Sequence, residues 1–273
     1  MNILGRDISR YWRRLPEAPA YLGYFIKCFW IFKNPVQFIT AYLTSNSIPG
    51  RMVEMRNGLK IHMSEHPHDT ISIFVVFVRN DYGPIQSGAS VIDIGANIGI
   101  FSLYAAQNKA ARVFSYEPCS ESFVILLNNI QANRLENTVF ARQLAIVGRP
   151  LGKVRFPVRS SMYNAILTDT DTADEFEWVE TASLKNIVSE SGSIDLLKID
   201  CEGAEYDIIF AGGENEYSRI HKLRLEYHRG KAEMLDTHLR LYGFVRRRAK
   251  SDTAQSGNVW YEKRTKQQAP PKT

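Results

Sequence analysis

The strongest constraint on the fold is a regular alternation of strand-like and helix-like segments after residue 90. Short apolar runs occur at VIDIG (91–95), RVFSYEP (112–118), IDLLKID (194–200) and HKLRLEYH (221–228). Each run is followed by a segment whose apolar residues have helical spacing. This order predicts an α/β fold with a doubly wound, mostly parallel sheet. The later segments GFVRRRA and NVWYEKR are expected to add a terminal antiparallel hairpin.

Four polar residues lie at or near the ends of the predicted strands. They are Asp93, Glu117, Asp200 and His228. Ligands of a doubly wound sheet bind at the carboxyl ends of its strands, near the point where the strand order reverses. We therefore expect these four side chains along one edge of the sheet, in a ligand-binding cleft.

The turn after the first strand, G-A-N-I-G, includes Gly95, Ala96, Asn97 and Gly99. It departs from the dinucleotide fingerprint G-x-G-x-x-G, because Asn97 stands where the backbone must approach a pyrophosphate. The third glycine of the fingerprint is also missing. One interpretation is a cofactor loop for a ligand without phosphates. The alternative is that Asn97 and Asp93 only cap the helix and shape the turn of a domain without a cofactor.

Two acidic residues favour a particular ligand for this turn. Asp93 lies two residues before Gly95, where its carboxylate would repel phosphates and favour a cationic ligand. Glu117 lies 22 residues after Gly95, at the end of the second strand, a position suited to binding two ribose hydroxyls. S-adenosylmethionine has a sulfonium, an ammonium and a ribose but no phosphate. The pattern therefore favours S-adenosylmethionine over a dinucleotide.

A second motif brings in a known family. The stretch IDLLKIDCEGAEYDII (194–209), taken with VIDIGANIGIF, SYEPCSESFVILLNNIQAN and LRLEYH, resembles the FkbM family of S-adenosylmethionine-dependent methyltransferases. The resemblance covers roughly residues 90–228, and the K-I-D-x-E-G-x-E block is its specific part. It implies a Rossmann-like, class I methyltransferase fold with a seven-stranded sheet. It also implies O-methylation, typically of sugar hydroxyls or polyketide-type natural products, often in polysaccharide or glycolipid pathways.

The resemblance also assigns roles to single residues. It implies that Asp93, Gly95, Asn97 and Gly99, with Ala96 between them, form the cofactor loop, and that Glu117 holds the ribose. Asp200 and Glu202 would lie beside the transferred methyl group. Glu226 and His228 would face the same cleft from the fifth strand.

An acceptor hydroxyl must lose its proton, which requires a base or a metal ion. The ordinary pKa of histidine, near 6.5, makes His228 the first candidate for the general base and Asp200 the second. The acids together with His228 could also hold Mg²⁺, which we do not favour, so no metal ligand is assigned. Lys198 shares a strand face with Asp200 and is expected to pair with an acid of the cleft. Glu205 is expected to be a helix-turn or salt-bridge residue.

Charge is distributed unevenly along the chain. Residues 1–60 carry 9 Lys/Arg and 3 Asp/Glu, and residues 240–273 carry 9 and 2, so the ends are +6 and +7. The net charge of the whole chain is +5, which leaves −8 for the middle. Solvated basic ends explain this pattern, and attraction to an anionic membrane or a polyanionic substrate is the sharper alternative.

The segment 21–43 is rich in aromatic residues at helical spacing and is interrupted at Asn34-Pro35, which predicts two short amphipathic helices. We expect them to pack on the main domain as a helical cap. Insertion into a membrane surface is the alternative. It is based on basic residues beside aromatic ones, namely Arg10, Arg13, Arg14, Lys27 and Lys33 beside Tyr24, Phe25, Phe29 and Trp30.

The predicted organisation is a basic, aromatic helical segment (1–50), a methyltransferase domain that begins with a hairpin (51–264) and a disordered tail (265–273). Three scattered cysteines favour a reducing cytoplasm. The longest apolar run, 21–32, is too short for a membrane span. We expect a cytoplasmic protein, with peripheral contact to the inner membrane face as an alternative.

The leading functional prediction is an S-adenosylmethionine-dependent O-methyltransferase whose partner is a saccharide or glycoconjugate acceptor. An NAD-dependent oxidoreductase is disfavoured by the glycine pattern and by Asp93. A non-catalytic module that only binds cofactor or glycan is disfavoured by the intact Asp200, Glu202 and His228. Nucleic-acid methylation is disfavoured because the body around the predicted cleft is acidic and no aromatic-plus-basic motif is present.

Overall fold

The computed structural model describes most of the chain, namely residues 2–3, 6–7, 18–159, 164–167, 175–228, 230, 232–250 and 256–264. The predicted tail, 265–273, therefore lies outside the described residues, as do Arg10, Arg13 and Arg14. No helix in the described part of the chain is long and apolar enough to cross a membrane.

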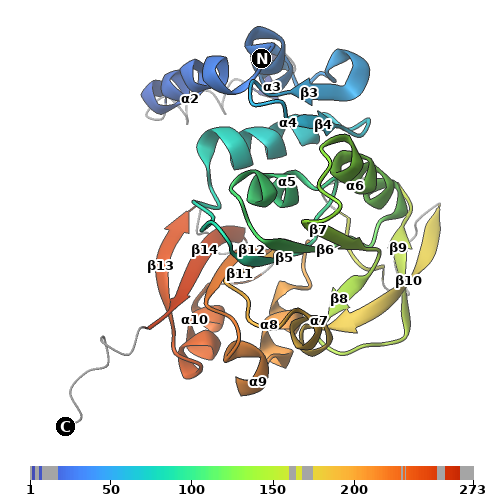
Figure 1. Cartoon of the computed structure of the whole chain (residues 1–273), viewed down its shortest axis with the longest axis vertical. Coiled ribbons are helices and arrows are strands. Elements are labelled where there is room, and N and C mark those ends of the chain that lie inside the picture. The colour runs from blue at the N-terminus through green and yellow to red at the C-terminus, as the bar shows by residue number, and fades with distance from the viewer. Residues whose placement is uncertain are drawn as a thin grey trace.

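A seven-stranded sheet forms the centre of the molecule (Figure 1). In spatial order its strands are β13 (Phe244–Lys250), β14 (Ser256–Lys263), β12 (Lys222–His228), β11 (Leu196–Ile199), β5 (Ser90–Ile94), β6 (Arg112–Tyr116) and β7 (Val139–Arg142). Strands β7, β6, β5, β11 and β12 are parallel, and β14 runs antiparallel between β12 and β13. The order reverses between β5 and β11. This confirms the predicted Rossmann-like sheet and its terminal hairpin.

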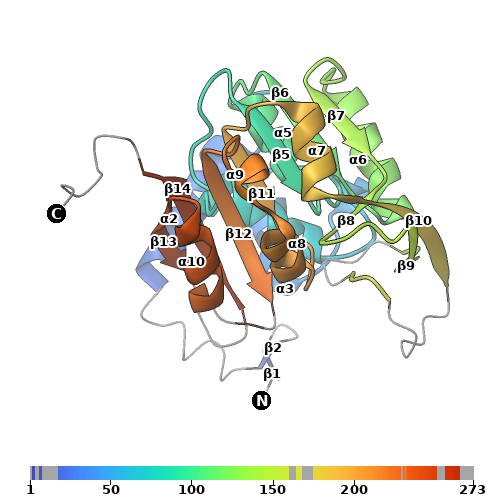
Figure 2. The ribbon, with the colours of Figure 1, turned by 90° about the horizontal axis from the view of Figure 1, so that it is seen from below.

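Helices cover both faces of the sheet, because successive strand residues point to opposite sides (Figures 1 and 2). On β5, Val91 belongs to one hydrophobic core and Ile92 to the other. The first face is covered by α5 (Ile100–Gln107) and α6 (Ser120–Ala132). The second is covered by α7 (Leu184–Ser191), α8 (Glu205–Ala211), α9 (Glu214–Tyr217) and α10 (Ala232–Leu241). Helix α6 starts at Ser120, with Cys119 at its N-cap.

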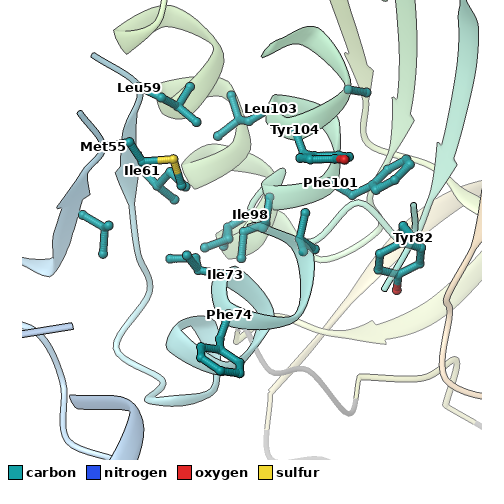
Figure 3. Packing of buried hydrophobic residues seen from close by; sticks show 14 of the residues in the cluster. Met55, Leu59, Ile61, Ile73, Phe74, Tyr82, Ile98, Phe101, Leu103 and Tyr104 are labelled. Carbon is teal, nitrogen blue, oxygen red and sulfur yellow. The ribbon is translucent and has the colours of Figure 1, made fainter. Parts of the chain in front are cut away.

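The N-terminal segment forms the predicted helical cap over α5 and α6. Its elements are α2 (Ala18–Ile31), α3 (Pro35–Thr44), η2 (Pro49–Arg51), β3 (Met52–Glu54), β4 (Lys60–His62), α4 (His68–Ile73) and the π-helical η3 (Phe74–Arg79), after a two-stranded pair β1 (Asn2–Ile3) and β2 (Arg6–Asp7). Proline at the first position of α3 explains the break between α2 and α3. Cys28, Phe32 and Phe38 are buried in the same core as Phe74 and Ile98, so core packing is confirmed for this part of the cap (Figure 3 shows Phe74 and Ile98).

A second, smaller sheet lies beside the β7 edge, far from the β13–β14 hairpin (Figure 2). Its order is β8 (Ala145–Val147), β10 (Phe176–Ser183) and β9 (Lys153–Pro157). Strand β10 was not predicted, because Val179 is its only buried residue and its sequence therefore lacks a clear alternation of apolar and polar side chains. A residue of β9, Phe156, reaches the cavity described below.

Candidate active site

The turn between β5 and α5 is fixed by close backbone contacts. Gly95 has a φ of 72°, and a Cβ atom there would overlap the carbonyl oxygen of Asp200 at the end of β11. The amides of Gly95 and Ala96 donate hydrogen bonds to the carbonyl of Tyr116 at 3.0 and 3.1 Å. The loop is therefore held between the ends of its two neighbouring strands, and only glycine fits at position 95.

Glu117 organises the open side of this turn. One carboxylate oxygen accepts the amide of Asn97 at 2.7 Å, and the other accepts the amide of Cys119 at 2.9 Å. Burial raises the pKa of Glu117 to about 7 against these two hydrogen bonds. Asn97 adopts the left-handed conformation, with a φ of 51°. Glu117 and Asn97 both line the cavity.

Asp93 and Gly99 were expected to contact the cofactor, but neither residue lines the cavity. The Asp93 side chain is fully buried behind the loop and does not line the cavity. It pairs with the ammonium of Lys198 at 3.0 Å and accepts the Ser102 hydroxyl at 2.6 Å. Gly99 caps α5 and packs against Leu126. Both residues therefore support the loop, and Asp93 does not present its charge to a ligand directly.

Lys198 connects the cofactor loop with Asp200 at the end of β11. A pairing of this lysine with an acid of the cleft was expected. Its ammonium donates to the carbonyl of Gly95 at 2.8 Å and lies 3.9 Å from the Asp200 carboxylate. Burial opposes the charge, but the neighbouring carboxylates of Asp93 and Asp200 raise the pKa of Lys198. The buried lysine thus remains a cation that neutralises Asp93 and faces Asp200.

Tyr82 is a site residue that the sequence analysis did not find. Its hydroxyl donates to Asp200 at 3.2 Å and lies 3.5 Å from a carboxylate oxygen of Glu226. Burial and the charge of Asp200 raise the pKa of Glu226 to about 7. The Tyr82 ring lies beside Phe101 at the end of the first core, with ring centroids 5.1 Å apart (Figure 3).

The loop that carries Tyr82 is held by residues far along the chain. Trp260 of β14 donates to the carbonyl of Asp81 at 3.1 Å, and Arg224 of β12 donates to the carbonyl of Tyr82 at 3.3 Å. A side chain at Gly83 would overlap the Trp260 ring. No local motif marks Tyr82; the only sequence signal is Gly83, which permits this contact.

His228 forms a second charged cluster with Glu202 and Glu205. Its Nδ1 lies 2.9 Å from Glu205, and its Nε2 lies 3.5 Å from Glu202. The buried Glu205 carboxylate also accepts the amides of Cys201 and Gly203, so it fixes both the β11–α8 turn and the histidine ring. The expectation that Glu205 is a turn and salt-bridge residue is confirmed.

The structure changes the expected role of His228. Burial opposes its charge, but the hydrogen bond to Glu205 and the charge of Glu202 raise the pKa of His228 to about 9. The ring does not line the cavity, whereas Asp200, Glu202 and Glu226 do. At neutral pH His228 is therefore mainly an imidazolium behind Glu202, and the ordinary pKa near 6.5 does not apply.

Three of these groups have an arrangement that would accommodate a divalent ion. One donor atom each from Asp200, Glu202 and His228 lies within 4.8 Å of the others. Among the residues that the structure describes, this is the only such group of three. The Nδ1 contact of His228 with Glu205 is the outer contact that commonly orients a metal-binding histidine.

These side chains surround a cavity of about 250 Å³ at the carboxyl ends of β5, β6, β11 and β12. One wall is apolar and includes Ile71, Val75, Ile100 and Phe101. In the part of the chain that the structure describes, the polar lining carries four carboxylates, from Glu117, Asp200, Glu202 and Glu226, and one ammonium, that of Lys198. This donor set fits a cationic ligand with a ribose, such as S-adenosylmethionine, and is unsuited to the pyrophosphate of a dinucleotide.

Comparisons with known proteins agree with this fit. Residues 93–250, more than half of the chain, match the family model described as the methyltransferase FkbM domain. The AMB antimetabolite synthetase AmbE of Pseudomonas aeruginosa is 25% identical over 232 residues, which cover 68% of this chain but only 11% of that protein. Methyltransferase sdnD of Sordaria araneosa is 26% identical over 178 residues, which cover 54% of this chain and 69% of that protein.

The chain thus spans about a tenth of the length of the first of these relatives. Among solved structures, TrmK of M. capricolum in complex with S-adenosyl-homocysteine is 13% identical, with a TM-score of 0.45. That match covers 68% of this chain and 66% of the other.

Proposed function

Because this chain belongs to the FkbM methyltransferase family, with S-adenosylmethionine as its cofactor, we propose that it methylates a hydroxyl group of a saccharide, glycolipid or related natural product. The observation that carries the proposal is the row of carboxylates beside the cofactor loop. Asp200, Glu202 and Glu226 line the cavity next to Gly95 and Asn97. These groups suit an acceptor that donates hydrogen bonds and must lose a proton.

Asp200 is the best-placed proton acceptor for this reaction. An alcohol is a poor nucleophile at neutral pH, so a base must remove its proton as the new bond forms. The bound cofactor supplies a methyl group on a good leaving group. Asp200 lines the cavity and follows directly on β11 beside the cofactor loop, whereas His228 lies behind Glu202. We therefore assign the general base to Asp200, with the imidazolium of His228 holding Glu202 in place.

The remaining residues position Asp200 and the acceptor. The Tyr82 hydroxyl donates to Asp200, and the Lys198 ammonium lies nearby at 3.9 Å. Glu226, whose pKa is raised to about 7, carries a proton part of the time near neutral pH and can then donate to an acceptor oxygen. A polyhydroxylated acceptor satisfies such a mixed set of donors and acceptors, whereas the acidic lining repels a phosphodiester backbone.

A divalent ion bound by Asp200, Glu202 and His228 would be a second way to activate the hydroxyl, by lowering its pKa. The two mechanisms differ in a simple test. With Asp200 as a free base, treatment with EDTA leaves methyl transfer unchanged. With a metal-assisted reaction, EDTA abolishes transfer and added Mg²⁺ restores it.

The deciding experiment is an acceptor screen with purified protein and S-adenosylmethionine. Free and lipid-linked saccharides, hydroxylated natural products, amines and tRNA are incubated separately, and S-adenosylhomocysteine release is measured. We expect release only with hydroxyl-bearing acceptors, and a product that mass spectrometry shows to be O-methylated. Asp200→Asn is the inactive control, and Asp207→Asn, an exposed acid on the adjacent helix α8, is the matched control. Transfer to tRNA or to an amine would overturn the proposal, as would S-adenosylhomocysteine binding without transfer to any acceptor.

A further inference from the structure

Helix α2 has apolar side chains on two opposite faces. One face is buried, because Cys28 and Phe32 belong to the core. Leu22, Ile26, Phe29 and Trp30 recur at the spacing of a single helical face, and their exposed fractions are 63%, 54%, 49% and 78%. We call these four residues the outer face of α2. Figure 1 shows α2 at the periphery of the molecule, in the layer farthest from the central sheet.

The sequence analysis grouped Tyr24 and Phe25 with the membrane alternative, but they do not belong to the outer face. Tyr24 packs edge-on against Phe74 with ring centroids 5.9 Å apart, and Phe25 lies 6.2 Å from the same ring. Core packing therefore explains one face of α2 and leaves the outer face unexplained. A contiguous exposed apolar patch on a helix commonly marks an interaction surface.

The surroundings of the outer face are basic. Within residues 18–62 the exposed charged residues are five cations, Lys27, Lys33, Arg51, Arg56 and Lys60, and the only acid is the half-buried Glu54. Arg56 donates through Nε to the carbonyl of Phe29 at 2.8 Å, which places a guanidinium directly beside the outer face. Lys33 lies just beyond the end of α2 and pairs with Glu54, and Arg51 pairs with Glu65. The middle of the chain, in contrast, is acidic.

We propose that the outer face of α2 binds the surface of an anionic lipid bilayer. Leu22, Ile26, Phe29 and Trp30 would enter the boundary between headgroups and acyl chains, and Arg56 would contact anionic headgroups. Charge complementarity favours this occupant. The face also lies on an exposed helix and not in a groove, which suits insertion into lipid better than docking of a partner helix.

Docking by this face would bring the cavity close to the membrane. Tyr24 of α2 lies against Phe74, the first residue of η3, with ring centroids 5.9 Å apart, so α2 packs directly on η3. The next residues of η3, Val75 and Val76, line the cavity. One helical layer, about 10 Å thick, therefore separates the docking helix from the cavity wall. If the proposed function holds, this arrangement favours acceptors carried on lipids, but the docking itself does not depend on it.

Vesicle co-sedimentation of the full chain tests the proposal without any acceptor. We expect the protein to sediment with phosphatidylcholine vesicles that contain phosphatidylglycerol and to stay in solution with phosphatidylcholine alone. High salt should weaken the interaction at least about tenfold, because basic residues contribute to it. The double variant Ile26→Glu/Trp30→Glu should lose sedimentation at least as strongly, since it places two charges on the outer face.

A matched control separates this face from general stickiness. Trp178 on β10 is also exposed, by 61%, but lies in the small sheet beyond β7. Trp178→Glu should sediment like the unchanged protein, and both variants should bind S-adenosylhomocysteine normally, which shows that they are folded. Equal sedimentation of the double variant would overturn the proposal. No sedimentation with anionic vesicles would do the same, as would a dimer that dissociates only in the double variant and thereby identifies a second copy as the occupant.

Discussion

The two sides of the cavity are built in different ways. The cofactor side comes from one local unit, β5, its turn and β6, and it is held by backbone amides and by the close approach of Gly95 to Asp200. The acid side collects side chains from separate segments, with Tyr82, Lys198, Glu205 and Glu226 each in a different one. Backbone shape thus fixes the side proposed to bind the cofactor, whereas long-range side-chain contacts arrange the side proposed to activate the acceptor. Variants on the two sides should therefore affect different measurements.

Asp200→Asn should have the largest effect and should act on the acid side alone. Removal of a general base typically lowers a rate by about 10²–10⁴-fold. We expect a loss of methyl transfer in this range, while calorimetric titration shows S-adenosylhomocysteine affinity within about twofold, since the asparagine is isosteric and lies outside the loop. The rate of the unchanged protein should not rise with pH between 7 and 9. A rise toward the pKa of His228, about 9, would instead identify His228 as the base.

Gly95→Ala should weaken binding of the cofactor. The new Cβ would overlap the Asp200 carbonyl at a φ of 72°, so the loop must shift. We expect affinity for S-adenosylhomocysteine to fall about 100-fold, which corresponds to about 3 kcal/mol, together with a lower unfolding temperature. The control is Gly88→Ala, at a φ of 81° with no atom within 4 Å of the added Cβ. It should cost only about 1 kcal/mol in stability and leave affinity unchanged. Equal affinity in both variants would contradict the proposed loop.

Tyr82→Phe should lower the rate of methyl transfer by a smaller factor and leave cofactor binding unchanged. The change removes one buried hydroxyl that donates to Asp200 and keeps the ring beside Phe101. Loss of such a hydrogen bond costs about 1–2 kcal/mol, so we expect roughly tenfold slower transfer at unchanged S-adenosylhomocysteine affinity. Its pH–rate profile should also change, because the variant removes a hydroxyl that contacts the side chains of both Asp200 and Glu226. An unchanged rate and profile would mean that Tyr82 only fills space.

Glu226→Gln should alter the pH dependence of stability. The pKa of Glu226 is raised from 4.5 to about 7 in the folded protein, so the folded state binds more protons than the unfolded state between these values. Its contribution to stability is complete below about pH 4.5 and is lost as pH rises through about 7. Denaturant titrations at several pH values should show a decline in the unfolding free energy that Glu226→Gln reduces by at most about 1.4 kcal/mol per pH unit. Glu233→Gln, an exposed acid on α10, should leave the decline unchanged.

The parts of the fold that the sequence predicted are those with a strong local pattern. The alternation after residue 90, the hairpin that begins the methyltransferase domain and the two helices of the cap were all predicted, and the structure has each of them. The run 71–79 remained unassigned, because a short aliphatic segment suits a strand as well as the helix that it forms. Strand β10 was missed because it has almost no buried face.

The candidate site divides in the same way. The sequence placed Asn97 and Glu117 at the cavity, because a local turn and a fixed spacing determine their positions. It could not show that Lys198 neutralises Asp93, or that Glu205 raises the pKa of His228. These outcomes depend on side-chain packing between neighbouring strands and helices. The position of the loop that carries Tyr82 depends on Trp260, a residue far along the chain.

The position of Trp260 also affects the order in which the parts of the cavity can form during synthesis of the chain. Ribosomes make the chain from its N-terminus, so the segments of the cofactor loop and Tyr82 emerge long before β14. Until residue 260 has emerged, the carbonyl of Asp81 lacks its indole partner and β12 lacks its antiparallel neighbour. A growing polypeptide therefore acquires the acid side of its cavity last. A nascent chain that has not yet formed β14 therefore lacks the indole that holds the loop carrying Tyr82.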